Sequence, residues 1–128
     1  MTEISLIIPA YNEAAIIQAT VGELDAFMKR AMPGRTYEII VVDDGSTDGM
    51  ADKLTALDMP NLRVERHARN RGRGAGVRTG FAVAVGEYVV TLDSDLSYSP
   101  DHIPRMLAPL EEGKADIGRL ARILHEAS

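Results

Sequence analysis

A chain of 128 residues with 45% apolar and 26% charged residues has the composition of one soluble globular domain. Its lack of cysteine excludes disulfide bonds and thiolate metal sites, and its formal net charge of −5 argues against nucleic acid as a partner. No apolar run reaches the roughly 18 residues of a membrane-spanning helix, and the first residues lack the basic region of a signal peptide. These features predict a single domain over residues 1–128 in the cytoplasm.

Apolar runs alternate with amphipathic segments along the chain. Short continuous apolar runs are typical of strands buried on both faces, and we expect strands at 4–9, 37–44, 61–67 and 87–93. Helical spacing of apolar residues predicts helices from Asn12 to about 31, from Ser46 or Thr47 to about 57, at 77–85, from Ser99 to about 112 with Pro100 at its first position, and at 117–127. Within the third of these helices, Gly80 is expected at a point of close packing.

This alternation predicts an α/β fold with a Rossmann-like, doubly wound, mostly parallel sheet of about four strands and helices on both faces. In such sheets, ligands bind beyond the carboxyl ends of the strands. The residues that follow each apolar run are therefore the candidates for a site. Three strand ends carry carboxylates, and the remaining one carries a basic, glycine-rich segment.

The fourth predicted strand runs into the sequence DSD, with Asp93 and Asp95 on either side of Ser94. Two carboxylates at one strand end can reach a common point, and their hard oxygen atoms suit Mg²⁺ or Mn²⁺. The alternative is that one Asp caps the turn and the other is solvated. The acidic residues at neighbouring strand ends favour the metal site.

The second predicted strand runs into DDGSTD. Asp43 and Asp44 follow the apolar run directly, and Gly45 permits a sharp exit from the strand. A carboxylate in this place can accept N–H or hydroxyl donors from a base or a ribose. For Asp48 we expect only a capping role near the start of the next helix.

Between the third strand and its helix lies NRGRGAG (70–76), which predicts a glycine-rich loop. Six arginines fall within 63–78, and arginine is the preferred partner of phosphate oxygens. The alternative is a solvated basic face. The glycine spacing superficially resembles a dinucleotide-binding fingerprint, but that motif belongs to the first strand–helix turn.

The three histidines do not cluster in the sequence. His102 lies near DSD at the start of a predicted helix and could approach the site. His67 and His125 are expected at the surface.

Together these segments resemble the family-two glycosyltransferases, which have a nucleotide-diphospho-sugar transferase fold. The stretches that carry the resemblance occur in the family's order: SLIIPAYNE, YEIIVVDDGSTDG, NRGRGAGVRTGF and GEYVVTLDSDLSYSPDHIPRML. They cover residues 4 to about 112. Within the family, the likeness is greatest to dolichyl-phosphate mannose synthase and other polyprenyl-phosphate glycosyltransferases.

The resemblance implies an inverting transfer of a hexose from a nucleotide-diphospho-sugar, with mannose from GDP-mannose preferred over a UDP-hexose, to a lipid-phosphate or glycan acceptor. It implies Asp93 and Asp95 as catalytic residues, and a Mg²⁺ or Mn²⁺ ion held by Asp93, Asp95 and Ser97, where Ser97 replaces a glutamine of the mannose synthases. It implies that donor binding involves Pro9, Ala10, Tyr11, Glu13, Asp43, Asp44, Arg71, Gly72, Arg73, Asp93 and Ser94.

The resemblance ends near residue 113, where family members normally continue into an acceptor-binding part. We therefore expect the N-terminal, donor-binding part of the fold, with 114–128 as an atypical closing segment. The apolar face of 117–127 favours an ordinary closing helix; the alternatives are that it covers a sheet edge or pairs with a second copy in a homodimer. A lipid acceptor would imply peripheral contact with the cytoplasmic face of a membrane. Two alternatives remain: a nucleotide-sugar-binding or interaction module without turnover, and a phosphatase with an aspartate nucleophile, whose DxD motif usually follows the first strand.

Overall fold

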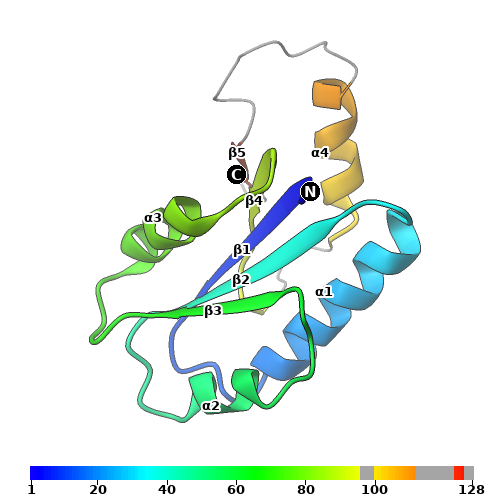
Figure 1. Ribbon diagram of the computed structural model, residues 1–128. Helices are drawn as coiled ribbons and strands as arrows, with labels where there is room; N and C mark the ends of the chain where they lie inside the picture. Colours follow the sequence, from blue (N-terminus) through cyan, green and yellow to red (C-terminus); the bar gives the residue numbers. More distant parts are fainter. Residues whose placement is uncertain (96–99, 112–122, 126–128) are drawn as a thin grey trace.

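The apolar runs of the sequence form one parallel sheet in the computed structural model, which describes residues 1–95, 100–111 and 123–125. The strands are β1 (Ile4–Ala10), β2 (Tyr37–Asp43), β3 (Leu62–Arg66), β4 (Tyr88–Thr91) and β5 (Ile123–His125). Their order across the sheet is β3-β2-β1-β4-β5, and every pairing is parallel (Figure 1). The doubly wound parallel sheet is confirmed, with a short fifth strand in addition to the four expected.

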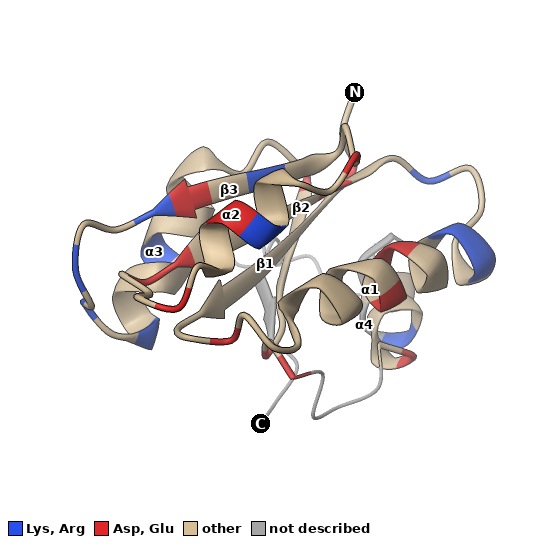
Figure 2. Cartoon of the chain, turned by 90° about the horizontal axis from the view of Figure 1, so that it is seen from below, with Lys and Arg blue, Asp and Glu red and all other residues tan. Residues whose placement is uncertain are grey.

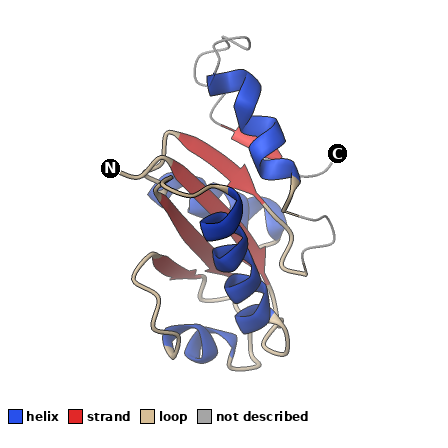
Figure 3. Ribbon diagram, turned by 90° about the vertical axis from the view of Figure 1, so that its right-hand side faces the viewer, coloured by secondary structure: helices blue, strands red, loops and turns tan. Residues whose placement is uncertain are grey.

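Helices cover both faces of the sheet, as the alternating pattern predicts. They are α1 (Ile17–Ala31), α2 (Met50–Thr55), α3 (Arg73–Val83) and α4 (His102–Glu111). Apolar side chains of α1, α2 and α4 form one core with one face of β1, β2 and β4, whereas α3 packs on the opposite face (Figures 1 and 3). Every residue of β1 is buried, because this strand lies at the centre of the sheet with helices on both sides. None of the described helices is long and apolar enough to cross a membrane.

The contact of α3 with the sheet depends on glycine. A Cβ atom added at Gly80 would lie 2.5 Å from Cγ2 of Ile7 in β1, and one added at Gly76 would lie 3.0 Å from Cβ of Pro9. The close packing expected at Gly80 is thus confirmed. These two glycines bring the backbone of α3 close to β1, so that the start of α3 lies beside the carboxyl end of the central strand.

The first two helices begin later than expected. Asn12 does not cap α1, which begins at Ile17, and instead has a φ of 53°. Its backbone N–H donates to Oγ of Ser46, and its Oδ1 accepts from the N–H of Thr47. The residue at the N-cap position of α2 is Gly49 rather than Ser46 or Thr47. The polar groups of these residues join the β1–α1 loop to the β2–α2 loop, and so they do not cap the helices.

The third helix begins earlier than expected, at Arg73 rather than near Val77, because close packing on β1 orders part of the glycine-rich stretch as helix. The fourth begins at His102 rather than at Pro100, and Ser99 lies outside the described residues.

The helix expected at 117–127 is wrong for Ile123–His125, which form strand β5 beside β4. A short apolar run fits a strand as well as a helix, and pairing with the edge of β4 satisfies backbone groups that a helix would leave exposed there. The rest of the expected closing segment lies outside the described residues.

Candidate nucleotide-sugar site

A cleft of about 340 Å³ opens at the carboxyl ends of β1, β2 and β4. The chain leaves β1 toward α1 on one face of the sheet and leaves β3 toward α3 on the other face, which separates the loops at this point. The residues that line the cleft are Pro9, Ala10, Tyr11, Glu13, Asp44, Asn70, Gly72, Arg73, Asp93, Ser94 and Asp95. All of them except Asn70 were predicted from the sequence as site residues.

The DSD sequence lies on the β4 side of the cleft. The strand ends at Thr91, the N–H of Leu92 donates to the carbonyl of Ile7, and the turn that follows presents Asp93 and Asp95. Oγ1 of Thr20 in α1 donates to the carbonyl oxygen of Ser94 at 2.6 Å. The turn is therefore attached both to the central strand β1 and to helix α1, so that the backbone between the two carboxylates is held in place.

The guanidinium of Arg73 lies beside the carboxylate of Asp93. Nη1 of Arg73 is 3.2 Å from Oδ1 of Asp93, and both side chains are partly exposed. Arg73 is the first residue of α3, and the preceding Gly72 has a φ of 96° that places the chain in the left-handed region. The ion pair joins α3 to the β4 side of the cleft, next to a helix N-terminus that favours anions.

Asp44 forms the opposite side of the cleft. Its Oδ1 accepts from the backbone N–H of Arg71, and its Oδ2 accepts from the N–H of Gly72, each at 2.8 Å. Oδ1 is also 2.7 Å from Nδ1 of His67. This buried carboxylate therefore connects the end of β2 to the loop that leads into α3.

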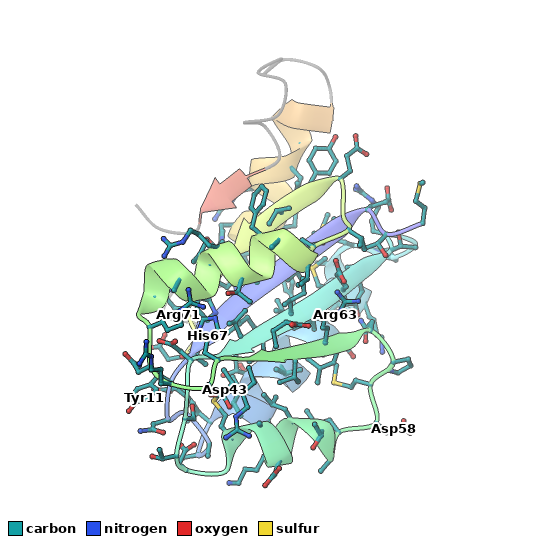
Figure 4. All side chains as sticks on the ribbon, turned by 60° about the vertical axis from the view of Figure 1, so that its left-hand side comes forward. Tyr11, Asp43, Asp58, Arg63, His67 and Arg71 are labelled. Atoms are coloured by element: carbon teal, nitrogen blue, oxygen red, sulfur yellow. The ribbon has the colours of Figure 1, made fainter. Side chains whose placement is uncertain are left out.

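The surface position expected for His67 is wrong. Its side chain is only 4% exposed and lies between Asp44 and Thr79, whose Oγ1 is 2.7 Å from Nε2 of the ring. The register of β2 and β3 pairs Asp43 with Arg66, so Asp44 and His67, which follow the two strands, are neighbours as well. Figure 4 shows His67 and Asp43 near each other at the ends of these strands. The alternation of β3 in the sequence does not reveal this neighbour.

The remaining predicted residues lie elsewhere. Asp43 is buried outside the cleft, where its Oδ1 accepts from the N–H of Ser46 and its Oδ2 is 3.7 Å from Nε of Arg66. The side chain of Arg71 is exposed and does not line the cleft, although its backbone N–H holds Asp44. Ser97 lies outside the described residues, and His102 is not among the described residues that line the cleft.

Asp48 has the structural role expected of it. Its Oδ1 accepts from the N–H of Met50 at the start of α2, and its Oδ2 accepts from the N–H of Ala14. Asn70 is the cleft residue that sequence reasoning missed, and its Nδ2 donates weakly, at 3.4 Å, to the carbonyl of Asp44. The only signal for Asn70 was its position at the beginning of the glycine-rich stretch.

The arginines of 63–78 are exposed, and Figure 2 shows basic residues on β3, on the connection to α3 and on α3 itself. Within the described residues, three of their side chains have polar partners: Arg63 donates to the carbonyl of Val83, Arg66 lies beside Asp43, and Arg73 lies beside Asp93. The basic segment is thus partly a solvated face, and Arg73 is its member that lines the cleft.

The pKa of Asp44 gives the first testable expectation. Burial raises this pKa, but hydrogen bonds from His67 and from the N–H groups of Arg71 and Gly72 outweigh burial and hold it below the ordinary value of 3.8. The folded protein therefore binds this proton less readily than the unfolded chain. The stabilisation from ionised Asp44 is complete above about pH 4 and is lost as the pH falls through the folded-state pKa.

Urea denaturation of the wild type and of Asp44→Asn between pH 2 and pH 7 checks this expectation. The variant should be less stable at pH 7, and its free energy of unfolding should fall less steeply in acid. Asp58→Asn, an exposed change away from the cleft, should keep the wild-type slope. Identical slopes for Asp44→Asn and the wild type would contradict the assigned contacts.

Comparison with known proteins decides the family. The family model of Glycosyl transferase family 2 matches residues 5–126, nearly the whole chain. The chain belongs to this family.

The glycosyl transferase family 2 chain is similar to bacterial polyprenyl-phosphate sugar transferases. It is 39% identical over 119 residues to an undecaprenyl-phosphate 4-deoxy-4-formamido-L-arabinose transferase of Serratia proteamaculans. The aligned region covers 91% of this chain and 36% of that protein. The protein of the same name from Klebsiella pneumoniae is 36% identical over 119 residues, with the same coverage. The chain thus spans just over a third of the length of these curated relatives.

Solved structures of similar fold include two with bound nucleotide-sugar and Mn²⁺. One is the mannosyltransferase PcManGT from Pyrobaculum calidifontis with GDP-Man and Mn²⁺ (TM-score 0.68, 30% identity, 83% of this chain and 32% of that chain). The other is glucosyl-3-phosphoglycerate synthase from Mycobacterium tuberculosis with Mn²⁺, UDP-glucose and phosphoglyceric acid (TM-score 0.68, 28% identity, 88% and 41%). The predicted nucleotide-diphospho-sugar transferase fold is thus confirmed.

The described residues of this family-two chain offer a divalent cation an incomplete set of ligands. Within residues 1–95, 100–111 and 123–125, no group of three or more His, Cys, Asp and Glu side chains could hold a metal. Asp93 and Asp95 bring two carboxylates to the cleft. Mg²⁺ usually takes one or two protein carboxylates and completes its shell with water and substrate phosphate. The residues present therefore suit an ion shared with a diphosphate.

Proposed function

We propose that this chain binds the nucleotide-diphospho-sugar donor of a glycosyltransferase that moves a hexose, with inversion, to a polyprenyl phosphate. Membership of glycosyl transferase family 2 supports the reaction class. The names of the similar bacterial proteins, which are undecaprenyl-phosphate sugar transferases, support the acceptor class.

The observation that carries the proposal is the juxtaposition in the cleft of Asp93, Asp95 and Arg73 with Asp44 on the opposite side. The first three residues offer what a metal–diphosphate needs: two carboxylates for the cation and a guanidinium with a helix N-terminus for phosphate oxygens. The opposite side, with Pro9, Ala10 and Tyr11 at the end of β1, offers a half-exposed aromatic ring and backbone groups for the nucleoside.

We assign roles on this basis. Asp93 and Asp95 would hold Mg²⁺ or Mn²⁺, and the bound ion would neutralise charge that develops on the departing diphosphate. Arg73 would approach the same phosphate oxygens while it pairs with Asp93. Tyr11, Glu13 and Asp44 would surround the base and ribose.

The proposed transfer forms one bond and breaks one bond. An acceptor oxygen attacks the anomeric carbon, while the bond from that carbon to the diphosphate oxygen breaks and the nucleoside diphosphate leaves with the electron pair. A phosphate acceptor is already anionic, so it needs little help from a general base, whereas a hydroxyl acceptor would require one. The two carboxylates are accordingly assigned to the leaving group rather than to deprotonation of the acceptor.

The donor is the finer part of the proposal. Mannose from GDP-mannose is the donor that the sequence resemblance favours, and PcManGT, with 30% identity, is a family neighbour bound to GDP-Man. A UDP-hexose is the competing donor, because the 28% identical synthase is bound to UDP-glucose. In the described part of the cleft, Asp44 and backbone groups can bind either base. The cleft therefore does not distinguish a guanine donor from a uracil donor.

Titration calorimetry of the 128-residue chain tests the proposal. GDP-mannose and UDP-glucose are each titrated with Mn²⁺ and again with EDTA, and ADP-glucose serves as a third base. We expect one donor to bind with Mn²⁺ and to bind at least about tenfold more weakly with EDTA, since the ion is shared between protein and diphosphate. Failure of all three donors to bind, or binding that ignores EDTA, would overturn the proposed site.

The alternative of a binding module without turnover predicts the same titration, so a transfer assay separates it. The donor that binds is incubated with Mn²⁺ and short-chain polyprenyl phosphate, and the nucleoside diphosphate released is measured. Release that depends on the acceptor supports transfer, and binding without release supports the module. Homodimer formation, membrane contact and a cytoplasmic location are separate predictions that this assay does not test.

A further inference from the structure

Three polar side chains from three different elements form a continuous chain beside the cleft. Asp44 follows β2, His67 follows β3, and Thr79 lies in α3. Nδ1 of His67 is 2.7 Å from Oδ1 of Asp44, and Nε2 of His67 is 2.7 Å from Oγ1 of Thr79. Because Asp44 and His67 are buried, neither can exchange these contacts for water without cost.

The chemistry of the partners determines where the proton of His67 lies. An ionised carboxylate only accepts hydrogen bonds, and the contacts of Asp44 favour its ionised form. Nδ1 must therefore carry the proton that is donated to Asp44. In a neutral ring Nε2 is then the acceptor, and the hydroxyl of Thr79 donates to it. This arrangement satisfies both ring nitrogens and fixes the orientation of the ring.

Asp44 in turn determines the conformation of the cleft wall. Its two oxygens hold the N–H groups of Arg71 and Gly72, immediately before α3 begins at Arg73. Gly72 and Arg73 line the cleft, and Arg73 reaches Asp93 on the far side. A rotation of the Asp44 carboxylate would release both amides and would alter the backbone that places Arg73.

We propose that His67 is a positioning residue of the nucleotide site: protonated on Nδ1 and held by Thr79, it orients the Asp44 carboxylate so that Asp44 fixes the Arg71–Gly72 backbone at the mouth of the cleft. The inference rests on the proposed function for the nature of the ligand, but the hydrogen-bond chain itself does not. His67 does not line the cleft, so in this proposal it acts through Asp44.

Two substitutions of His67 separate orientation from space filling. The side-chain amide nitrogen of Asn lies about where Nδ1 lies in His, so His67→Asn keeps a donor to Asp44. Gln is longer and closer in volume to His, and its amide reaches the position of Nε2, so His67→Gln keeps the contact with Thr79 and loses the donor to Asp44. If His67 orients Asp44, His67→Asn should preserve nucleotide affinity better than His67→Gln. If His67 only fills space, His67→Gln should preserve it better.

The probes are GDP and UDP, each titrated with Mn²⁺ into the wild type and both variants. For the nucleotide that the wild type binds, His67→Gln should weaken binding about tenfold or more, because a hydrogen bond to a charged group is lost, and His67→Asn should weaken it only about threefold. Equal affinity of His67→Gln and the wild type, or a better affinity for His67→Gln than for His67→Asn, would overturn the proposal.

A second measurement does not depend on any ligand. Nitrogen NMR of His67 in the wild type should show the Nδ1-protonated form, and hydrogen exchange of the Arg71 and Gly72 amides should accelerate about tenfold or more in His67→Gln but much less in His67→Asn. A proton on Nε2 alone, or unchanged exchange in His67→Gln, would contradict the inference. If the wild type binds neither GDP nor UDP, a donor linked to either nucleotide is ruled out, while these NMR measurements still decide the role of His67.

Discussion

Asp95→Asn should remove most of the metal-dependent nucleotide affinity of this chain. A neutral amide oxygen is a much poorer ligand for a hard divalent cation than a carboxylate, and the described cleft offers only Asp93 and Asp95 beside each other for this purpose. We expect the affinity for the bound nucleoside diphosphate in Mn²⁺ to fall by about 100-fold, since loss of even an outer partner of a metal ligand costs roughly 10–100-fold. Calorimetry with Mn²⁺ and with EDTA measures the difference.

Two aspartates provide matched controls for Asp95→Asn. Asp58 is exposed and precedes β3, so it lies at the opposite end of that strand from His67 (Figure 4), and Asp58→Asn should leave the affinity unchanged. Asp48 links Ala14 to Met50 through its two oxygens, so Asp48→Asn should lower stability but keep the dependence on Mn²⁺. Equal losses of metal-dependent affinity for Asp95→Asn and Asp48→Asn would contradict the assignment of DSD as the metal site. In EDTA, Asp95→Asn and the wild type should bind nucleotide alike.

The central part of the fold could be predicted because its strands are buried on both faces. Continuous apolar runs such as ISLIIP that alternate with amphipathic segments are typical of the buried strands of a parallel sheet, and few other structures fit this pattern. The carboxyl ends of parallel strands then lie together whatever the details of the loops. For this reason the sequence alone predicts that residues after β1, β2 and β4 share one site, and residues from all three strand ends line one cleft.

The parts that could not be predicted depend on contacts between distant residues. Asn12 and Ser46 look like helix caps, yet their polar groups bind each other's loops. Burial of His67 follows from the register of β3 against β2, which a weak, partly exposed strand does not specify. At Ile123–His125 the apolar pattern is too short to distinguish a strand from a helix. Pairing with the edge of β4 makes this segment a strand.

The two aspartates of DDGS show the same limit within the site itself. Sequence reasoning treated Asp43 and Asp44 alike, but successive residues of a strand point to opposite sides. Asp43 is turned toward Ser46 and Arg66, whereas Asp44 lines the cleft and holds the N–H groups of Arg71 and Gly72. Only the direction of β2 relative to its neighbours determines which of the two lines the cleft.

Gly45→Ala should be the most damaging single substitution outside the apolar core. Gly45 has a φ of 78°, and a Cβ atom there would lie 2.4 Å from the carbonyl carbon of Arg69 and 2.5 Å from the backbone nitrogen of Asn70. These are backbone atoms of the loop that Asp44 holds, so they cannot move aside as a flexible side chain can. We expect the free energy of unfolding to fall by about 3 kcal/mol or more, from left-handed strain together with displacement of the loop.

Gly49→Ala separates the two causes of this loss. Gly49 has a similar φ of 84°, but nothing lies within 4 Å of the position of an added Cβ. Its substitution should therefore cost only the left-handed strain, about 1–2 kcal/mol, and nucleotide affinity should be retained. Gly45→Ala should also lose nucleotide affinity under conditions where it is still folded, because the displaced loop carries Asn70 and leads to Gly72 in the cleft wall. Urea denaturation and nucleotide titration of both variants measure these effects, and equal stability losses for the two would show that the β3–α3 loop does not pack against Gly45.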